Sequence, residues 1–88
     1  MPYIKKEDRM RYDVKIDEMI SLLQYRSIGE VNYIFSRIVW KLFHFNKTYT
    51  FGNALVGMLE CVKNEFYRRK LSKYEDKKIL ENGDLPEA

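Results

Sequence analysis

The residues best suited to bind an anionic ligand lie between positions 63 and 74. Lys63 and Tyr67 are four residues apart, so they would share one face of a helix, and two arginines follow directly. An arginine guanidinium holds phosphate through paired hydrogen bonds, and a tyrosine ring offers a surface on which a base can stack. The pattern is therefore that of a nucleotide-binding surface. We call its five residues the tyrosine–cation cluster: Lys63, Tyr67, Arg68, Arg69 and Tyr74.

The same cluster also has a purely structural interpretation. Cations near the end of a helix complement its dipole, and Glu65 and Glu75 are close enough in the sequence to pair with them. Glu65 precedes Arg68 and Arg69 by three and four residues, which is the spacing of helical ion pairs. The residue types alone leave both interpretations open.

Groups for catalysis or metal binding are few. The chain has no glycine-rich phosphate loop and no HExxH motif, and it contains one cysteine, Cys61, and one histidine, His44. Cys61 lies beside the apolar stripe of its helix, which predicts a structural thiol rather than a nucleophile. Glu75 and Asp76 would need further ligands to hold a metal ion. We therefore expect no catalytic residue, no metal site and no cofactor, and a protein that is not an enzyme.

Length and charge limit the remaining possibilities. The chain has 88 residues, which predicts one domain over residues 1–88, and its net charge of +3 is too small for a long nucleic-acid footprint. No run of about 18 apolar residues and no apolar leader is present, so neither a membrane span nor a secretory signal is expected. The lone thiol suits a reducing compartment. We expect a cytoplasmic protein.

The elements that must position the cluster are helical. Apolar residues recur at helical spacing, and no strand-like alternation of any length is present. Asp13 and Ser27 are expected as N-caps, and Gly83 as the residue that ends the last helix. We therefore expect an all-α fold, a small bundle with three main helices and short flanking ones, at residues 6–12, 14–24, 30–45, 51–72 and 74–82.

The expected middle helix is apolar over most of its circumference. One stripe carries Val31, Phe35 and Leu42 among others, and the neighbouring face mixes aromatic and basic residues. A helix of this kind is buried on more than one side. In so short a chain the second covering surface is expected to be another subunit, which makes the protein a homo-oligomer. The alternative is a central helix wrapped by the rest of its own chain.

Several motifs resemble a family of short phage and bacterial proteins that was long left without a known function. They are the opening nine residues, the Asn32-Tyr33 pair, the run from Leu59 to Arg69 (LECVKNEFYRR), and the ending YEDxK…ENGD from Tyr74 to Asp84. The likeness covers nearly the whole chain. It differs where this chain has Ser72-Lys73, since the family pattern has an apolar residue or proline before Tyr-Glu-Asp.

The resemblance extends to viral sponge proteins, which sequester the cyclic nucleotide signals of bacterial immunity. It implies a phage-encoded, oligomeric anti-CBASS protein in the host cytoplasm, with a cyclic dinucleotide such as cGAMP as its ligand. Lys63, Arg68 and Arg69 would then hold phosphates, and Tyr67 and Tyr74 would stack on bases. Tyr3 or Tyr12 would close the pocket. The alternatives are a module that binds a host protein and, less favoured by the charge, a small DNA- or RNA-binding protein.

Overall fold

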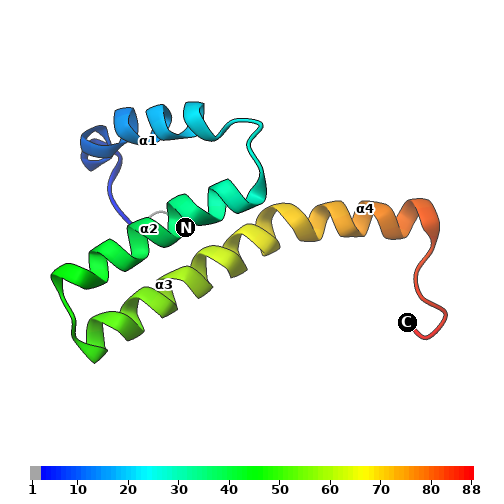
Figure 1. Cartoon of the computed structure of the whole chain (residues 1–88). Helices are drawn as coiled ribbons and strands as arrows, with labels where there is room; N and C mark the ends of the chain where they lie inside the picture. The colour runs from blue at the N-terminus through cyan, green and yellow to red at the C-terminus, as the bar shows by residue number, and fades with distance from the viewer. Residues whose placement is uncertain (1–2) are drawn as a thin grey trace. The chain divides into compact units, whose positions relative to one another are not determined.

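The computed structural model describes residues 3–88, which form two compact units. The first unit ends at Thr48 and the second begins at Tyr49. Every regular element among the described residues is a helix, which confirms the all-α expectation (Figure 1). Two elements are short or irregular, the 3₁₀ turn η1 and the π-helical segment η2.

The first unit begins with η1 (Lys6–Asp8) and α1 (Met10–Leu23). The expectation of two separate helices with Asp13 as the N-cap of the second was wrong. Arg9 already has helical backbone angles, and the Asp13 amide donates to the Arg9 carbonyl at 3.0 Å. Asp13 therefore lies inside the first turn of α1, where its negative charge still complements the helix dipole.

A tight connection joins α1 to α2 (Ile28–Phe45). Tyr25 has φ = 64°, a left-handed conformation that is unusual for a bulky residue, and it ends α1 with 97% of its surface exposed. The expected N-cap of the next helix is confirmed, because the Ser27 hydroxyl accepts a hydrogen bond from the Glu30 amide at 3.2 Å. The cap fixes where α2 begins and therefore which side chains share its faces.

The second unit is a single helical run from Tyr49 to Asn82. It consists of α3 (Tyr49–Phe66), η2 (Tyr67–Leu71) and α4 (Ser72–Asn82), and the run bends where α3 passes into α4 (Figure 1). The expected break between residues 72 and 74 was wrong, because Leu71 and Ser72 both have α-helical backbone angles. The expected stop is confirmed at Gly83, which has φ = 82° and donates its amide to the Ile79 carbonyl at 2.8 Å.

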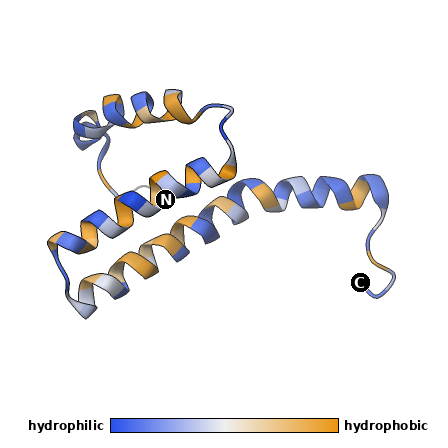
Figure 2. Cartoon of the chain, in the orientation of Figure 1, coloured by the Kyte–Doolittle hydropathy of each residue, from blue (hydrophilic) through white to orange (hydrophobic). Residues whose placement is uncertain are grey.

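Very little of the chain is buried. Leu55 is the one buried hydrophobic residue among those described, with 8% of its surface exposed. The accessible surface of the chain is 8565 Å². Two separately folded units, each with half the mass of the chain, would together expose about 6,600 Å². Apolar residues occur along both α2 and α3, while α4 is largely hydrophilic (Figure 2). The helices thus present much more accessible surface than folded domains of this size retain, and many large apolar side chains are exposed.

Candidate functional site

The tyrosine–cation cluster is centred on η2, where the helix is wound more loosely than an α-helix. In a π-helix each amide donates to the carbonyl five residues back, and the Ser72 amide does so to Tyr67. The Ser72 hydroxyl also donates to the Arg68 carbonyl at 2.6 Å. Both a π-turn and a serine bonded to the preceding turn bend helices. Single π-turns inside α-helices occur frequently at functional sites.

Tyr67 is held across this segment by a carboxylate. Its hydroxyl donates a 2.5 Å hydrogen bond to Glu75 Oε2, eight residues along the chain. This hydrogen bond, then desolvation, and then the negative charges of Glu75 and Asp76 raise the pKa of the Tyr67 hydroxyl above its ordinary value. Tyr67 is 46% exposed, so its ring remains accessible while its hydroxyl is fixed.

The cations of the cluster are paired with carboxylates of the same helix. Lys63 Nζ lies 3.2 Å from Glu60 Oε1, and Arg69 Nη1 donates to Glu65 Oε1 at 3.0 Å. Arg68 lies further from the same Glu65 oxygen, at 3.9 Å. The expected ion pairs of Glu65 are therefore confirmed. The side chains of all three cations are more than half exposed, and exposed pairs of this kind contribute about 0–1 kcal/mol each.

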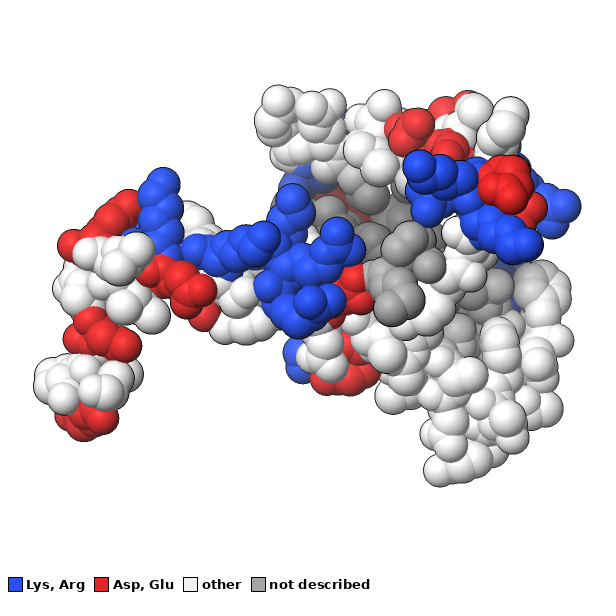
Figure 3. Space-filling model, turned by 180° about the vertical axis from the view of Figure 1, so that it is seen from behind, with Lys and Arg blue, Asp and Glu red and all other residues white. Residues whose placement is uncertain are grey.

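Tyr74 lies at the start of α4 and is 59% exposed. Its ring faces the ammonium group of Lys78 at 5.6 Å from the centroid. Lys70 and Lys73 also belong to this stretch, and no ion pair is found for either of them within the described chain. Figure 3 shows Lys and Arg side chains gathered on one stretch of the surface, next to a more acidic end.

The five predicted residues therefore lie along one continuous helical run, from α3 through η2 to α4. Lys63 contacts Glu60 rather than sharing a contact with Tyr67. Tyr3 and Tyr12 belong to the first unit and are exposed. Sequence reasoning missed the role of Glu75 as the partner of Tyr67. Residues eight apart lie about 12 Å apart along the axis of an α-helix, so the sequence predicts no direct contact between them. The π-turn that lies between these two residues has no simple sequence signal.

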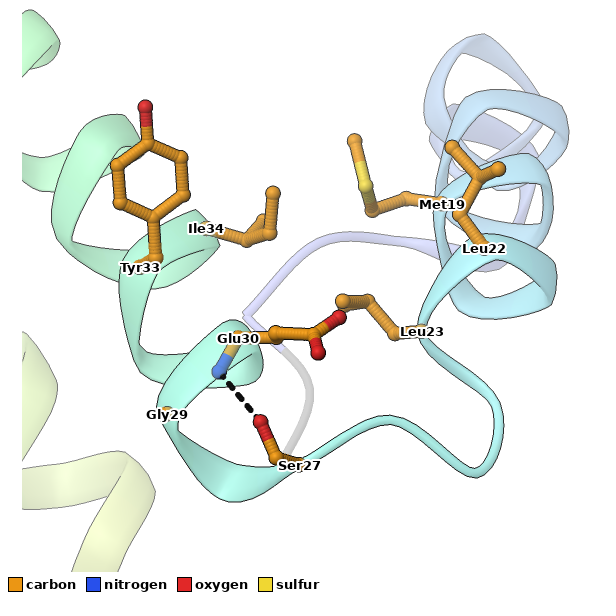
Figure 4. A pocket seen from close by; sticks show the side chains of 8 residues that line it. All are labelled: Met19, Leu22, Leu23, Ser27, Gly29, Glu30, Tyr33 and Ile34. Atoms are coloured by element: carbon orange, nitrogen blue, oxygen red, sulfur yellow. Dashed lines mark hydrogen bonds between the residues drawn. The ribbon is translucent and has the colours of Figure 1, made fainter.

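The first unit contains an open hollow of about 520 Å³ that the sequence did not indicate. Its apolar walls come from α1, with Met19, Leu22 and Leu23, and from Ile34 of α2 (Figure 4). Glu30 and Tyr33 of α2 line its polar side. Its volume lies within the range of small-molecule pockets. It contains a single acidic group and no arginine or lysine, so it is poorly suited to hold phosphate.

Other candidate groups are isolated. Cys61 is a free and exposed thiol. Its neighbours in the apolar stripe, such as Val62, are themselves more than half exposed. Within residues 3–88, no three His, Cys, Asp or Glu side chains are grouped so that they could share a metal ion. None of the described helices is both long and apolar enough to cross a membrane.

Comparison with known protein families places the chain in one of them. The family described as "Domain of unknown function (DUF6899)" matches residues 1–85. The chain belongs to this family. The DUF6899 match spans both compact units, including the whole tyrosine–cation cluster. No curated protein and no solved structure matches the chain significantly.

Proposed function

We propose that the chain is a non-enzymatic, phage-encoded binding protein that sequesters a cyclic oligonucleotide signal of host immunity, such as a cyclic dinucleotide. The observation that carries the proposal is the position of the tyrosine–cation cluster on the π-helical segment. Two arginines and one lysine lie beside two exposed tyrosine rings, and one ring is oriented by Glu75. The same stretch of helix thus carries cations that can bind phosphate and aromatic rings on which bases can stack.

The ion pairs within the cluster do not prevent such binding. The cation of each pair is more than half exposed, although the Glu65 side chain is 28% exposed, and exposed pairs contribute about 0–1 kcal/mol. A phosphate that accepts hydrogen bonds from an arginine fork gains about 1.5–3 kcal/mol per charged hydrogen bond. An anionic ligand can therefore replace Glu65 at Arg68 and Arg69.

A single copy of the cluster is exposed along one helix, so a ligand would touch one side only. A protein that competes with a receptor for a small signal needs to enclose it, which one helix cannot do. The proposal therefore includes a homo-oligomer in which more than one copy contacts the ligand. The excess accessible surface of the chain supports this part of the proposal.

Calorimetry of the full chain against a panel of cyclic dinucleotides and trinucleotides tests the proposal. We expect at least one ligand to bind with Kd well below about 10 µM. Replacing Arg68 and Arg69 by alanine should weaken binding at least about 10-fold. Replacing Arg9 and Arg11 removes the same charge from the first unit and should change nothing. Absence of binding to every member of the panel would refute the proposal, and recovery of a hydrolysed ligand would identify an enzyme instead.

A module that binds a host protein is the second candidate. The observation that favours it is Trp40, which is 73% exposed on α2, because exposed tryptophans are frequent hot spots of protein interfaces. A single host protein recovered in stoichiometric amount, together with no nucleotide in the purified sample, would favour this function. A small nucleic-acid-binding protein would instead show duplex binding that falls steeply with salt.

A further inference from the structure

The lysine and arginine on one face of α2 have no carboxylate partner among the described residues. Five residues at positions i, i+4, i+7, i+8 and i+11 share this face, which we call the cationic–aromatic face: Tyr33, Arg37, Trp40, Lys41 and His44. Arg37 Nη1 donates to the Tyr33 hydroxyl at 3.2 Å, and its guanidinium lies 5.9 Å from the centroid of that ring. Lys41 Nζ lies 5.5 Å from the ring centroid of Phe45.

This face differs from the tyrosine–cation cluster in its charge balance. No acidic residue occurs between Val31 and Leu59, and neither Arg37 nor Lys41 forms an ion pair with any described residue. Trp40 lies between them and is 73% exposed. An exposed tryptophan flanked by unpaired cations has the composition of an interface hot spot that receives an acidic partner.

The chain carries a surface of opposite charge in its last ten residues. Residues 79–88, which we call the acidic end, contain three carboxylates and no lysine or arginine: Glu81, Asp84 and Glu87. One of the three pairs with a neighbour, since Glu81 lies 3.1 Å from Lys78 in an exposed contact. Apolar side chains are interspersed and exposed, at 41% for Ile79, 87% for Leu80 and 72% for Leu85.

We propose that the cationic–aromatic face of one copy binds the acidic end of a second copy. The two surfaces match in charge and in apolar content, and both are present in every chain at equal concentration. The accessible surface of 8565 Å² exceeds the expectation for two folded units by roughly 1,900 Å². A stable interface of standard size needs about 800 Å² from each partner. Each chain therefore has enough surplus accessible surface to form two such interfaces.

The contact is head-to-tail, because it joins two different surfaces. Such interfaces close into rings when the rotation between neighbours permits it. The assembly does not depend on the ligand proposed above. A chain that binds no nucleotide would still be expected to associate in this way.

A charge exchange between two variants of the full chain tests the proposal. The first variant is Arg37→Glu with Lys41→Glu, and the second is Glu81→Lys with Asp84→Lys. In sedimentation or light-scattering measurements each variant alone should associate at least about 100-fold more weakly than the wild type, since like charges then face each other. An equimolar mixture should regain the mass of the assembly, because each reversed surface meets its opposite on the other variant.

The matched control is Arg11→Glu with Lys15→Glu, which changes the same charge at the same spacing on α1 and should leave the assembly intact. Circular dichroism checks that every variant keeps its helices. Trp40→Ala provides a second test that leaves the charge unchanged, and it should weaken association at least about 10-fold. A wild type that is monomeric at low salt overturns the proposal. It is also overturned if the mixture fails to regain mass while the helices are intact, or if the Trp40→Ala chain associates like the wild type.

Discussion

At the scale of single residues, Tyr67 and Glu75 form the best-defined interaction of the second unit. The hydroxyl donates to the carboxylate at 2.5 Å, and the neutral hydroxyl is the form that can donate. The bond therefore links the protonation of one tyrosine to the conformation of the π-helical segment, while the exposed ring stays available for stacking.

The stability of this segment should fall at high pH. The pKa of Tyr67 is raised in the folded chain, so its stabilising contribution is complete below the ordinary tyrosine pKa of about 10 and is lost as the pH rises through the folded value. Circular dichroism and tyrosinate absorbance against pH would show this. Tyr67→Phe should remove a tyrosinate transition above the ordinary range, whereas Tyr74→Phe should leave that transition in place. Unchanged titration of the Tyr67→Phe chain would contradict the assignment.

Gly57 offers a second prediction at this scale. It lies in the interior of α3, and an added Cβ would meet no atom within 4 Å. Because glycine costs a helix interior about 0.5–1 kcal/mol relative to alanine, Gly57→Ala should raise the free energy of unfolding by this amount.

Thermal or urea unfolding would measure the effect of Gly57→Ala. Gly83→Ala is the opposite case, since φ = 82° strains any residue with a Cβ and should lower stability by about 1–3 kcal/mol. Loss of assembly in the Gly57→Ala chain would show instead that another chain approaches α3 there.

At the scale of elements, the helix continues from α3 into α4 without a break, and this continuity determines where the residues of the tyrosine–cation cluster lie relative to one another. A break was expected between a helix ending at residue 72 and one beginning at residue 74, where Ser72-Lys73 departs from the pattern of the resembling family. Neither residue prevents helix formation, and the π-turn accommodates the bend without a break. The cluster therefore lies along one bent helix rather than across a corner between two.

Deletion of Lys70 should convert the π-turn into regular α-helix. The Ser72 amide would then donate to a carbonyl four residues back, so helix content should be retained. The hydrogen bond from Tyr67 to Glu75 should be kept, because the π-turn takes up one residue more than an α-turn and the deletion removes one residue, so Ser72 still bonds to the Tyr67 carbonyl and the flanking side chains keep their relative directions. The raised tyrosinate transition of Tyr67 should then remain.

Deletion of Lys77 is the matched control for the Lys70 deletion. It removes the same charge beyond Glu75 and should leave the Tyr67 titration unchanged. If the Lys70 deletion abolishes that titration while the helix content is retained, the extra residue of the π-turn is itself needed to position Tyr67.

Local rules predicted those features that depend on nearest neighbours along the helix. The Ser27 cap, the ion pairs of Glu65 and the stop at Gly83 all involve residues within four positions of each other. Features that depend on a change of helical winding were not predictable, and the partnership of Tyr67 with Glu75 is the clearest case. The five-residue cluster itself stays a prediction as a binding site.

At the scale of the whole molecule, the dominant feature is the scarcity of buried apolar surface. Leu55 is buried, but farther along its stripe the exposed fraction rises to 39% at Leu59 and 58% at Phe66. A helix of this kind draws most of its stability from packing rather than from propensity. We therefore expect folding to be coupled to association.

Association predicts that stability depends on protein concentration. If folded chains are stabilised by binding one another, the unfolding midpoint should rise as the concentration increases, by mass action. Thermal unfolding monitored by circular dichroism over a 100-fold or so range of concentration would test this. The charge-reversed chain with Arg37→Glu and Lys41→Glu should show a lower midpoint and a weaker dependence. A midpoint independent of concentration would indicate a self-sufficient monomer.

The π-turn also sets the direction in which the end of the chain faces. An α-helix advances by about 100° per residue, and a π-turn takes up one residue more than an α-turn does. Side chains after Leu71 are therefore rotated by roughly a quarter turn from where an unbroken α-helix would place them. The winding of five residues between Leu55 and Glu81 therefore determines the direction in which Glu81 faces.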